Sequence, residues 1–133
     1  MGCDGGVPRP MAVILIADDD ADTREVLDIL LMKAGHEVFK VESGDMAVMQ
    51  AQVLQPGLIL LDINIPGLDG FEVLARLKSD HETVEIPVVV ISGRDGFDDI
   101  ARGLGLGAAD YITKPYSSDD IINAVRANAA VAA

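Results

Sequence analysis

Short apolar runs alternate along this chain with longer segments in which apolar residues recur every three or four positions. Runs rich in β-branched residues are typical of strands, and the longer spacing is typical of amphipathic helices. This alternation predicts βαβ units wound around a parallel sheet. Five such units fit the chain, and we expect their strands at residues 12–17, 37–41, 58–62, 87–92 and 109–113.

The apolar runs differ in a way that predicts their places in the sheet. Residues 13–16, 58–61 and 88–91 are continuously apolar, as expected of strands that helices cover on both faces. The segment 37–41 mixes Glu and Lys with apolar residues, which suits an edge strand in contact with water. We therefore place the first three runs in the middle of the sheet.

Three sets of residues at helical spacing are interpreted as core-facing stripes. They are Thr23, Leu27, Leu30 and Ala34; Phe71, Leu74 and Leu77; and Ile121, Ile122 and Val125. Gly35 and Gly57 follow two helical patterns, where a left-handed closing residue is expected. Gly103 and Gly105 fall in the expected fourth helix, 95–106, and each weakens it by about 1 kcal/mol relative to alanine. We expect that helix to be short or mobile.

Length and charge limit the possible classes of protein. The 133 residues suit one domain, which we place at 12–130 between a flexible leader, 1–11, and a short tail, 131–133. The net charge of −12 argues against direct binding to nucleic acid. No apolar run approaches the length of a membrane span, and a single cysteine, Cys3, allows no internal disulfide. These features predict a soluble cytoplasmic protein with no membrane partner.

In an open parallel sheet, ligands bind beyond the carboxyl ends of the strands. The predicted ends carry Asp18, Asp19 and Asp20, then Asp62, then Ser92 and Gly93, and finally Lys114. Each has an ordinary structural explanation: a helix cap, a satisfied strand-end aspartate, a local hydrogen bond of serine, or a solvated lysine. Their occurrence together at four strand ends favours a functional site.

The chemistry of that set indicates phosphoryl transfer. Three carboxylates in one pocket, from Asp18, Asp19 and Asp62, either raise a pKa or recruit a cation, and hard oxygen ligands in little space favour Mg²⁺. A metal and Lys114 would neutralise the charge that develops during phosphoryl transfer. Asp62 would then attack in line, while Ser92 offers its hydroxyl to a phosphate oxygen.

Three segments carry a family resemblance: residues 14–20 (Ile-Leu-Ile-Ala-Asp-Asp-Asp), 60–70 (Leu-Leu-Asp-Ile-Asn-Ile-Pro-Gly-Leu-Asp-Gly) and 107–115 (Gly-Ala-Ala-Asp-Tyr-Ile-Thr-Lys-Pro). Over about residues 12–129 the chain resembles the response-regulator receiver family of two-component signalling, in the manner of the chemotaxis regulators. The resemblance implies a flavodoxin-like, doubly wound (βα)5 α/β fold with a five-stranded parallel sheet of order 2-1-3-4-5.

The resemblance also implies a role for each strand-end residue. Asp62 would be the phosphoacceptor, Asp18 and Asp19 the acidic pair for Mg²⁺, and the backbone carbonyl of Asn64 a further ligand. Lys114 would contact the phosphoryl group. The protein would not be a conventional enzyme, but a receiver that catalyses its own aspartyl phosphorylation and dephosphorylation.

Further implied roles concern switching. Ser92 would move toward the phosphate on activation, and Tyr111 would swing from an outward to an inward rotamer. Arg94 and Asn64 resemble positions that tune the lifetime of the phosphoryl group, and Pro115 would follow a cis peptide bond. The switched surface would be that of the fourth helix, fifth strand and fifth helix.

The implied partners are a sensor histidine kinase or a histidine phosphotransfer protein, and an unknown downstream protein. We expect a monomer, or a dimer favoured by phosphorylation. Two alternatives remain. One is an interaction module of the same fold that works without phosphorylation. The other is a phosphatase that acts on an external substrate through an aspartyl intermediate, which Asn64 disfavours because that class needs a second acid there. The chain is expected either to stand alone or to be part of a longer regulator.

Overall fold

The computed structural model describes residues 12–130, so the predicted leader, 1–11, and tail, 131–133, lie outside the described residues. Ten elements alternate strictly between strand and helix. The strands are β1 (Val13–Ala17), β2 (Glu37–Val41), β3 (Leu58–Asp62), β4 (Val88–Ser92) and β5 (Asp110–Thr113). The helices are α1 (Ala21–Lys33), α2 (Gly44–Leu54), α3 (Gly70–Ser79), α4 (Phe97–Gly105) and α5 (Ser118–Asn128).

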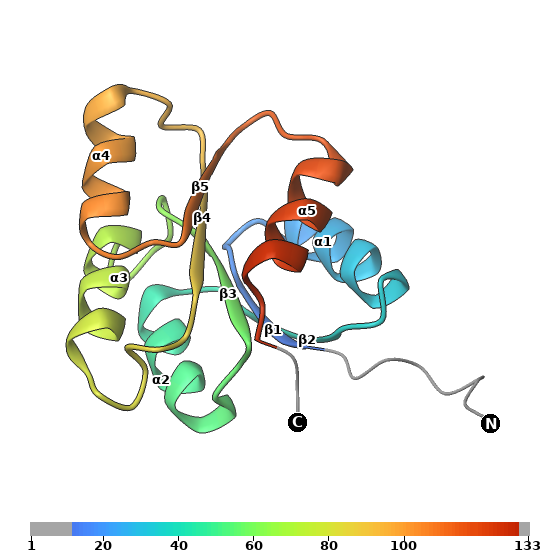
Figure 1. Ribbon diagram of the computed structural model, residues 1–133, viewed down its shortest axis with the longest axis horizontal. Coiled ribbons are helices and arrows are strands. Elements are labelled where there is room, and N and C mark those ends of the chain that lie inside the picture. The colour runs from blue at the N-terminus through green and yellow to red at the C-terminus, as the bar shows by residue number, and fades with distance from the viewer. Residues whose placement is uncertain (1–11, 131–133) are drawn as a thin grey trace.

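All neighbouring strands pair in parallel, in the order β2-β1-β3-β4-β5. The sheet stands between two layers of helices, with α1 and α5 on one face and α2, α3 and α4 on the other (Figure 1). Each face has its own apolar core, because alternate residues of a strand point to opposite sides. The predicted fold class and strand order are confirmed.

The burial of the strands follows the sequence pattern. Every residue of β3 and β4 is buried, as are four of the five in β1. The two edge strands, β2 and β5, have mostly exposed or half-buried residues. The prediction that 37–41 forms an edge strand is confirmed, and the predicted bounds of all five strands hold to within one residue.

Four of the five helices begin at a residue whose side chain accepts a hydrogen bond from a backbone N–H of the first turn. These capping residues are Asp20, Ser43, Asp69 and Ser117. Such caps satisfy donors that a helix leaves unpaired at its start. Helix α4 begins after Gly96 without a side-chain cap, so it is the least well anchored of the five.

Two details of the predicted helices were wrong. Gly35 does close α1 with a positive φ of 95°, but α2 is closed by Gln55 in the left-handed conformation, with φ 48°. Gly57 is needed for a different reason, since a Cβ there would overlap the backbone oxygen of Ala130. In α1, Leu27 and Leu31 are fully buried, whereas Ala34, which was predicted to face the core, is exposed at the end of the helix.

Helix α4 is short, as predicted, and spans nine residues. Only Gly103 is buried in it, whereas Phe97 is 83% exposed. An added Cβ at Gly103 would lie 2.9 Å from Cδ2 of Tyr111, so this glycine provides room for the tyrosine ring. Among residues 12–130, no helix has both the length and the apolar character that crossing a membrane requires.

Candidate functional site

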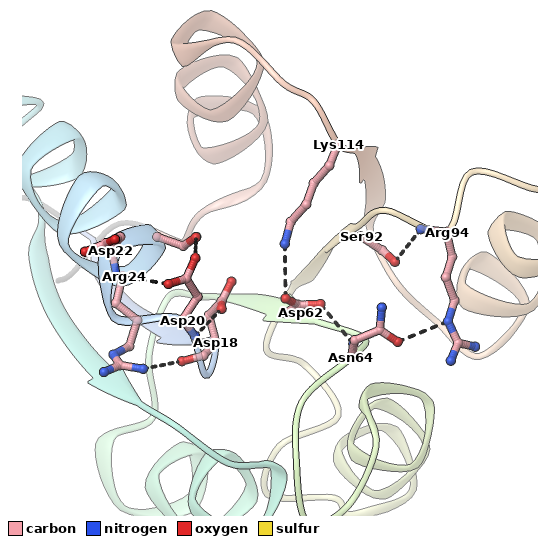
Figure 2. A network of polar contacts seen from close by, with 10 residues as sticks. Asp18, Asp20, Asp22, Arg24, Asp62, Asn64, Ser92, Arg94 and Lys114 are labelled. Carbon is pink, nitrogen blue, oxygen red and sulfur yellow. Dashed lines mark hydrogen bonds and ion pairs between the residues drawn. The ribbon is translucent and has the colours of Figure 1, made fainter.

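The strand ends predicted to carry the site meet at one edge of the sheet (Figure 2). Asp18 directly follows β1, Asp62 ends β3, Ser92 ends β4, and Lys114 directly follows β5. Because the four strands are parallel neighbours, their carboxyl ends lie side by side. Residues separated by as many as 96 positions, which is 114 minus 18, are thereby brought together.

Three carboxylates form the centre of the site. Oxygen atoms of Asp18, Asp19 and Asp62 all lie within 4.8 Å of one another. Asp18 is 3% exposed and Asp62 is 6% exposed, while Asp19 is open to solvent. Two of the three negative charges are therefore largely removed from water, which is costly unless a partner compensates them.

The electrostatic strain falls on Asp18. Burial and the neighbouring Asp62 raise its pKa from 3.8 to about 6, although a hydrogen bond from the backbone N–H of Asp20 opposes the rise. A carboxyl with a pKa this high holds a proton readily. A cation bound beside Asp18 would favour its charged form and lower this pKa.

Lys114 supplies one compensating positive charge. Its Nζ lies 3.2 Å from Oδ2 of Asp62, and Figure 2 shows the side chain reaching down to that carboxylate. Burial lowers the pKa of Lys114, but the charge and hydrogen bond of Asp62 more than offset this, so the pKa lies above its usual range. The peptide bond between Lys114 and Pro115 is cis, as expected.

The charges near the site fit a divalent cation. When all are ionised, the three carboxylates contribute a charge of −3 and the Lys114 ammonium contributes +1, so their net charge is −2. An ion of charge +2 with oxygen ligands would balance them, and Mg²⁺ prefers such ligands. The donor set therefore fits the metal that the sequence predicted.

The loop after Asp62 is held from two sides. The N–H of Asn64 donates to Oδ1 of Asp62 over 2.9 Å, which places the backbone of Asn64 at the site. A Cβ on Gly70 would overlap Cα of Ile63, and one on Gly44 would overlap the backbone oxygen of Leu68. Helices α2 and α3 thus approach this loop so closely that only glycine fits at either contact.

Ser92 is fully buried beside Asp62 in the sheet, and its Oγ accepts a hydrogen bond from the N–H of Arg94 over 2.9 Å. The Nε of Arg94 donates to Oδ1 of Asn64 over 3.1 Å. This bond joins the loops that follow β3 and β4 (Figure 2). The two residues predicted to tune phosphoryl lifetime are therefore in direct contact.

Tyr111 lies in β5, three residues before Lys114, and its hydroxyl bonds to a partner other than the carboxylates. Its ring packs against the apolar core between the sheet and α2, α3 and α4, next to Gly103. Its hydroxyl donates to the backbone oxygen of Arg94 over 2.7 Å. The tyrosine ring is thus half-buried, and its hydroxyl is bonded to the loop after β4, while the predicted swing of this side chain stays a prediction.

The sequence did not distinguish the role of Asp20 from those of Asp18 and Asp19, and it did not reveal the contact made by Arg24. Within the acidic triplet, Asp20 caps α1 and accepts a hydrogen bond from Oγ1 of Thr23, so the capping explanation holds for that residue alone. Arg24 donates to the backbone oxygen of Asp18 over 2.7 Å and supports the loop. Its place in the first turn of the helix is the only sequence signal for that contact.

Comparison with known families gives one assignment over most of the chain. The family described as response regulator receiver domain matches residues 14–126. These residues include every strand and helix in full, except for Val13 of β1 and the last two residues of α5.

Two curated relatives from Pseudomonas aeruginosa differ in length. The phosphate regulon transcriptional regulatory protein PhoB is 40% identical over 114 residues, which are 86% of this chain and 50% of PhoB. Protein PilH is 38% identical over 117 residues, which are 88% of this chain and 97% of PilH. The chain therefore spans half the length of PhoB but nearly all of PilH.

Solved structures agree with the fold. The crystal structure of the BeF3-activated N-terminal receiver domain of Klebsiella pneumoniae RstA matches with a TM-score of 0.80 and 27% identity. The match covers 87% of this chain and 97% of that one.

Proposed function

This chain belongs to the response regulator receiver domain family of two-component signalling, and from that premise we propose that it is a phosphorylation-dependent signalling switch. In this proposal, a phosphohistidine partner donates its phosphoryl group to Asp62 in a reaction that depends on Mg²⁺. The observation that carries it is the cluster of three carboxylates within 4.8 Å, with Lys114 on the acceptor aspartate.

Asp18, Asp19 and Asp62 would hold the Mg²⁺ through carboxylate oxygens, and the backbone carbonyl of Asn64 remains the predicted further ligand. The ion would offset negative charge on the transferred phosphoryl group. The raised pKa of Asp18 supports this assignment, because a buried carboxylate with no cation of its own gains most from a metal.

In the proposed phosphoryl transfer, one bond forms and one bond breaks. A carboxylate oxygen of Asp62 forms the new O–P bond while the N–P bond to the donor histidine breaks, and the donor nitrogen keeps the electron pair. Lys114, now 3.2 Å from that carboxylate, would then contact a phosphoryl oxygen. The Oγ of Ser92 now accepts a hydrogen bond from the N–H of Arg94. After the transfer, the Ser92 hydroxyl would instead donate to a phosphoryl oxygen, since a hydroxyl can both accept and donate.

Receiver domains partner with histidine kinases, and we propose a sensor kinase or a histidine phosphotransfer protein as the donor here. The output would be a change in the surface formed by α4, β5 and α5, read by a downstream protein. Whether the protein remains a monomer or dimerises when phosphorylated stays a prediction, as do the cytoplasmic location and the assignment of 12–130 as the receiver.

One observation favours a second candidate, an interaction module of the same fold that works without phosphorylation. The half-buried Tyr111 is held in one position by the hydrogen bond from its hydroxyl to the backbone oxygen of Arg94. A module held permanently in one surface state would show this arrangement. A module that works without phosphorylation would have no need for the buried acidic cluster. For that reason we place the interaction module second.

The test is incubation with Mg²⁺ and acetyl phosphate, followed by intact-mass analysis. We expect the mass of one phosphoryl group on the unchanged protein and none on Asp62→Asn. Asp98→Asn, a change of the same charge in the first turn of α4, should behave like the unchanged protein.

Beryllofluoride, which mimics an aspartyl phosphate, gives a second measurement without turnover. Its binding should require Mg²⁺ and should shift backbone NMR signals at Ser92 and Lys114. Equal mass changes in Asp62→Asn and the unchanged protein, or no response to either reagent, would overturn the proposed function in favour of the interaction module.

A further inference from the structure

A groove of about 530 Å³ runs along the outer edge of β5 and the adjoining side of α5. Its lining includes Asp110, Ile112, Asp120, Asn123, Ala124 and Ala127. Because β5 is an edge strand of the sheet, no further strand from the described part of the chain covers this side. The groove lies on the surface to which the proposed function assigns the output.

The shape of the groove follows from the sequence of α5. Asp120, Asn123, Ala124 and Ala127 are spaced three and four residues apart, so they lie on one side of the helix. The two alanines have small side chains and leave space against β5. The polar residues, Asp120 and Asn123, stand at the same side.

The charged side chains that line the groove are all negative. Among residues 12–130, its lining contains two carboxylates, from Asp110 and Asp120, and no lysine or arginine. Asp110 uses Oδ1 to accept the N–H of Tyr111 over 2.8 Å, and Asp120 uses Oδ2 to accept the N–H of Ser117 over 2.9 Å. Within the described part of the chain neither carboxylate forms an ion pair, so each keeps an oxygen for a partner.

We propose that this groove receives an arginine or lysine side chain from a segment of the downstream protein. The aliphatic part of such a side chain would lie against Ile112 and the alanines, and its charged end would reach the two carboxylates. The inference rests on the proposed function, since it names the chemistry of the partner that reads this surface.

Charge also argues against a second copy as the occupant. A symmetric pair formed through this groove would place the carboxylates of both copies near each other, and each chain carries a net charge of −12. Like charges at such an interface oppose association. A basic segment is instead attracted by the acidic protein from a distance.

The groove has a direct backbone connection to the acceptor site. Thr113 and Pro115 line it, while Lys114 between them sends its side chain to within 3.2 Å of Asp62. A change in the position of Lys114 on phosphorylation would move both neighbours. The occupancy of the groove and the state of Asp62 are therefore coupled in this proposal.

The test uses a short amphipathic peptide that contains arginine, and the same peptide with neutral citrulline in place of arginine. Each is titrated into the full chain and followed by backbone NMR. We expect the arginine peptide to shift the signals of Asp110, Ile112 and Asn123, and the citrulline peptide to leave them nearly unchanged. The double variant Asp110→Asn, Asp120→Asn should weaken binding about fivefold, since asparagine keeps the accepting oxygen but loses the charge.

Asp119→Asn is the matched control, because it removes the same charge from α5 outside the lining of the groove. If this control weakens the arginine peptide as much as Asp110→Asn does, the attraction is only that of the whole acidic protein, and the proposal fails. Equal binding of both peptides, shifts confined to other surfaces, or a doubled mass by light scattering would also overturn it.

The same samples are treated with Mg²⁺ and acetyl phosphate, so that the two proposals fail separately. Peptide binding in the groove without phosphorylation of Asp62 would overturn the proposed switch and leave the groove assignment standing. Phosphorylation of Asp62 without peptide binding would do the reverse.

Discussion

The central strands and the edge strand β5 both bring a residue to the site, yet they do so from very different surroundings. Asp62 ends β3, in which every residue is buried, and its side chain is 7% exposed. Lys114 follows β5, in which no residue is fully buried, and its side chain is 35% exposed. Asp62 is thus set in the core, and the Lys114 ammonium that pairs with it is carried by the rim of the sheet.

This difference suggests a division of labour. The proposed acceptor, Asp62, must keep a fixed geometry, and burial on both faces of the sheet holds it there. A residue that reports the state of the acceptor must be able to move, and elements with few buried contacts open at lower free energy. Helix α4, which buries only Gly103 and begins without a side-chain cap, extends the movable region.

The largest expected effect is on the stability of the centre. Leu60 in β3 is 1% exposed, and Leu60→Ala should lower the free energy of unfolding by about 2 to 5 kcal/mol, because it leaves a cavity. Ile112→Ala in β5 removes a half-buried side chain and should cost about 1 kcal/mol. Urea unfolding measures both values. Similar losses for the two variants would mean that the rim is as firmly packed as the centre.

A second expected effect concerns the proton on Asp18. Because its pKa in the folded protein is about 6, protons compete with Mg²⁺ as the pH falls through 6, and affinity for Mg²⁺ should drop by up to about tenfold per pH unit below that value. Isothermal titration between pH 7.5 and pH 5 measures it. Affinity that stays constant over this range would contradict the assignment of Asp18 as a ligand.

Without Mg²⁺ the same group affects stability with the opposite sign. A pKa raised in the folded state means that the folded protein binds the proton more tightly than the unfolded chain. This contribution to stability is complete below pH 3.8 and is lost as the pH rises through about 6. In metal-free protein, Asp18→Asn should therefore flatten the change in stability between pH 5 and pH 7, as measured by thermal unfolding.

The glycines of α4 give a smaller effect that tests the rim directly. Gly103→Ala would place a Cβ 2.9 Å from Tyr111, so the ring must shift, and we expect a net loss of about 1 kcal/mol together with altered NMR signals of Tyr111. Gly105→Ala is the control in the same helix, because nothing lies within 4 Å of its added Cβ. It should instead stabilise the protein by about 0.5 to 1 kcal/mol. A gain of stability in both variants would show that Tyr111 moves freely.

The smallest effect is expected at the opposite rim. Lys40 in β2 forms an ion pair of 2.6 Å with Asp28 of α1, and its side chain is 40% exposed. Lys40→Met should change the free energy of unfolding by less than about 1 kcal/mol, because exposed ion pairs are screened and cost side-chain entropy. A larger loss in urea unfolding would mean that this rim depends on charge as the centre depends on packing.

Much of this arrangement could be predicted from the sequence, because the decisive signals are local. The continuous apolar runs fixed the central strands, and the polar residue that ends each run identified Asp18, Asp62 and Ser92 as site candidates. The parallel sheet then brought them together without any further information. The family resemblance added the strand order and a role for each residue.

What could not be predicted depends on how distant backbones approach one another. Gly57 looked like a helix-closing residue, but it is needed because Ala130 passes over it. Gly103 looked only like a weak point of α4, yet it makes room for Tyr111. The hydrogen bond of Arg24 to the oxygen of Asp18 likewise has no counterpart in spacing or composition.

The two glycine contacts that hold the loop after Asp62 have a mechanical consequence. At Gly44 and Gly70 the helices meet that loop backbone to backbone, so this flank cannot yield without dragging α2 and α3 along. The opposite flank, formed by the loop after β4 and helix α4, has open space around Gly93 and Gly105, and the atoms nearest to its Gly103 belong to side chains, those of Tyr111 and Phe71, rather than to backbone. If a change at Asp62 displaces the surrounding segments, the loop after β4 and helix α4 would therefore move, while the loop after Asp62 would stay in place.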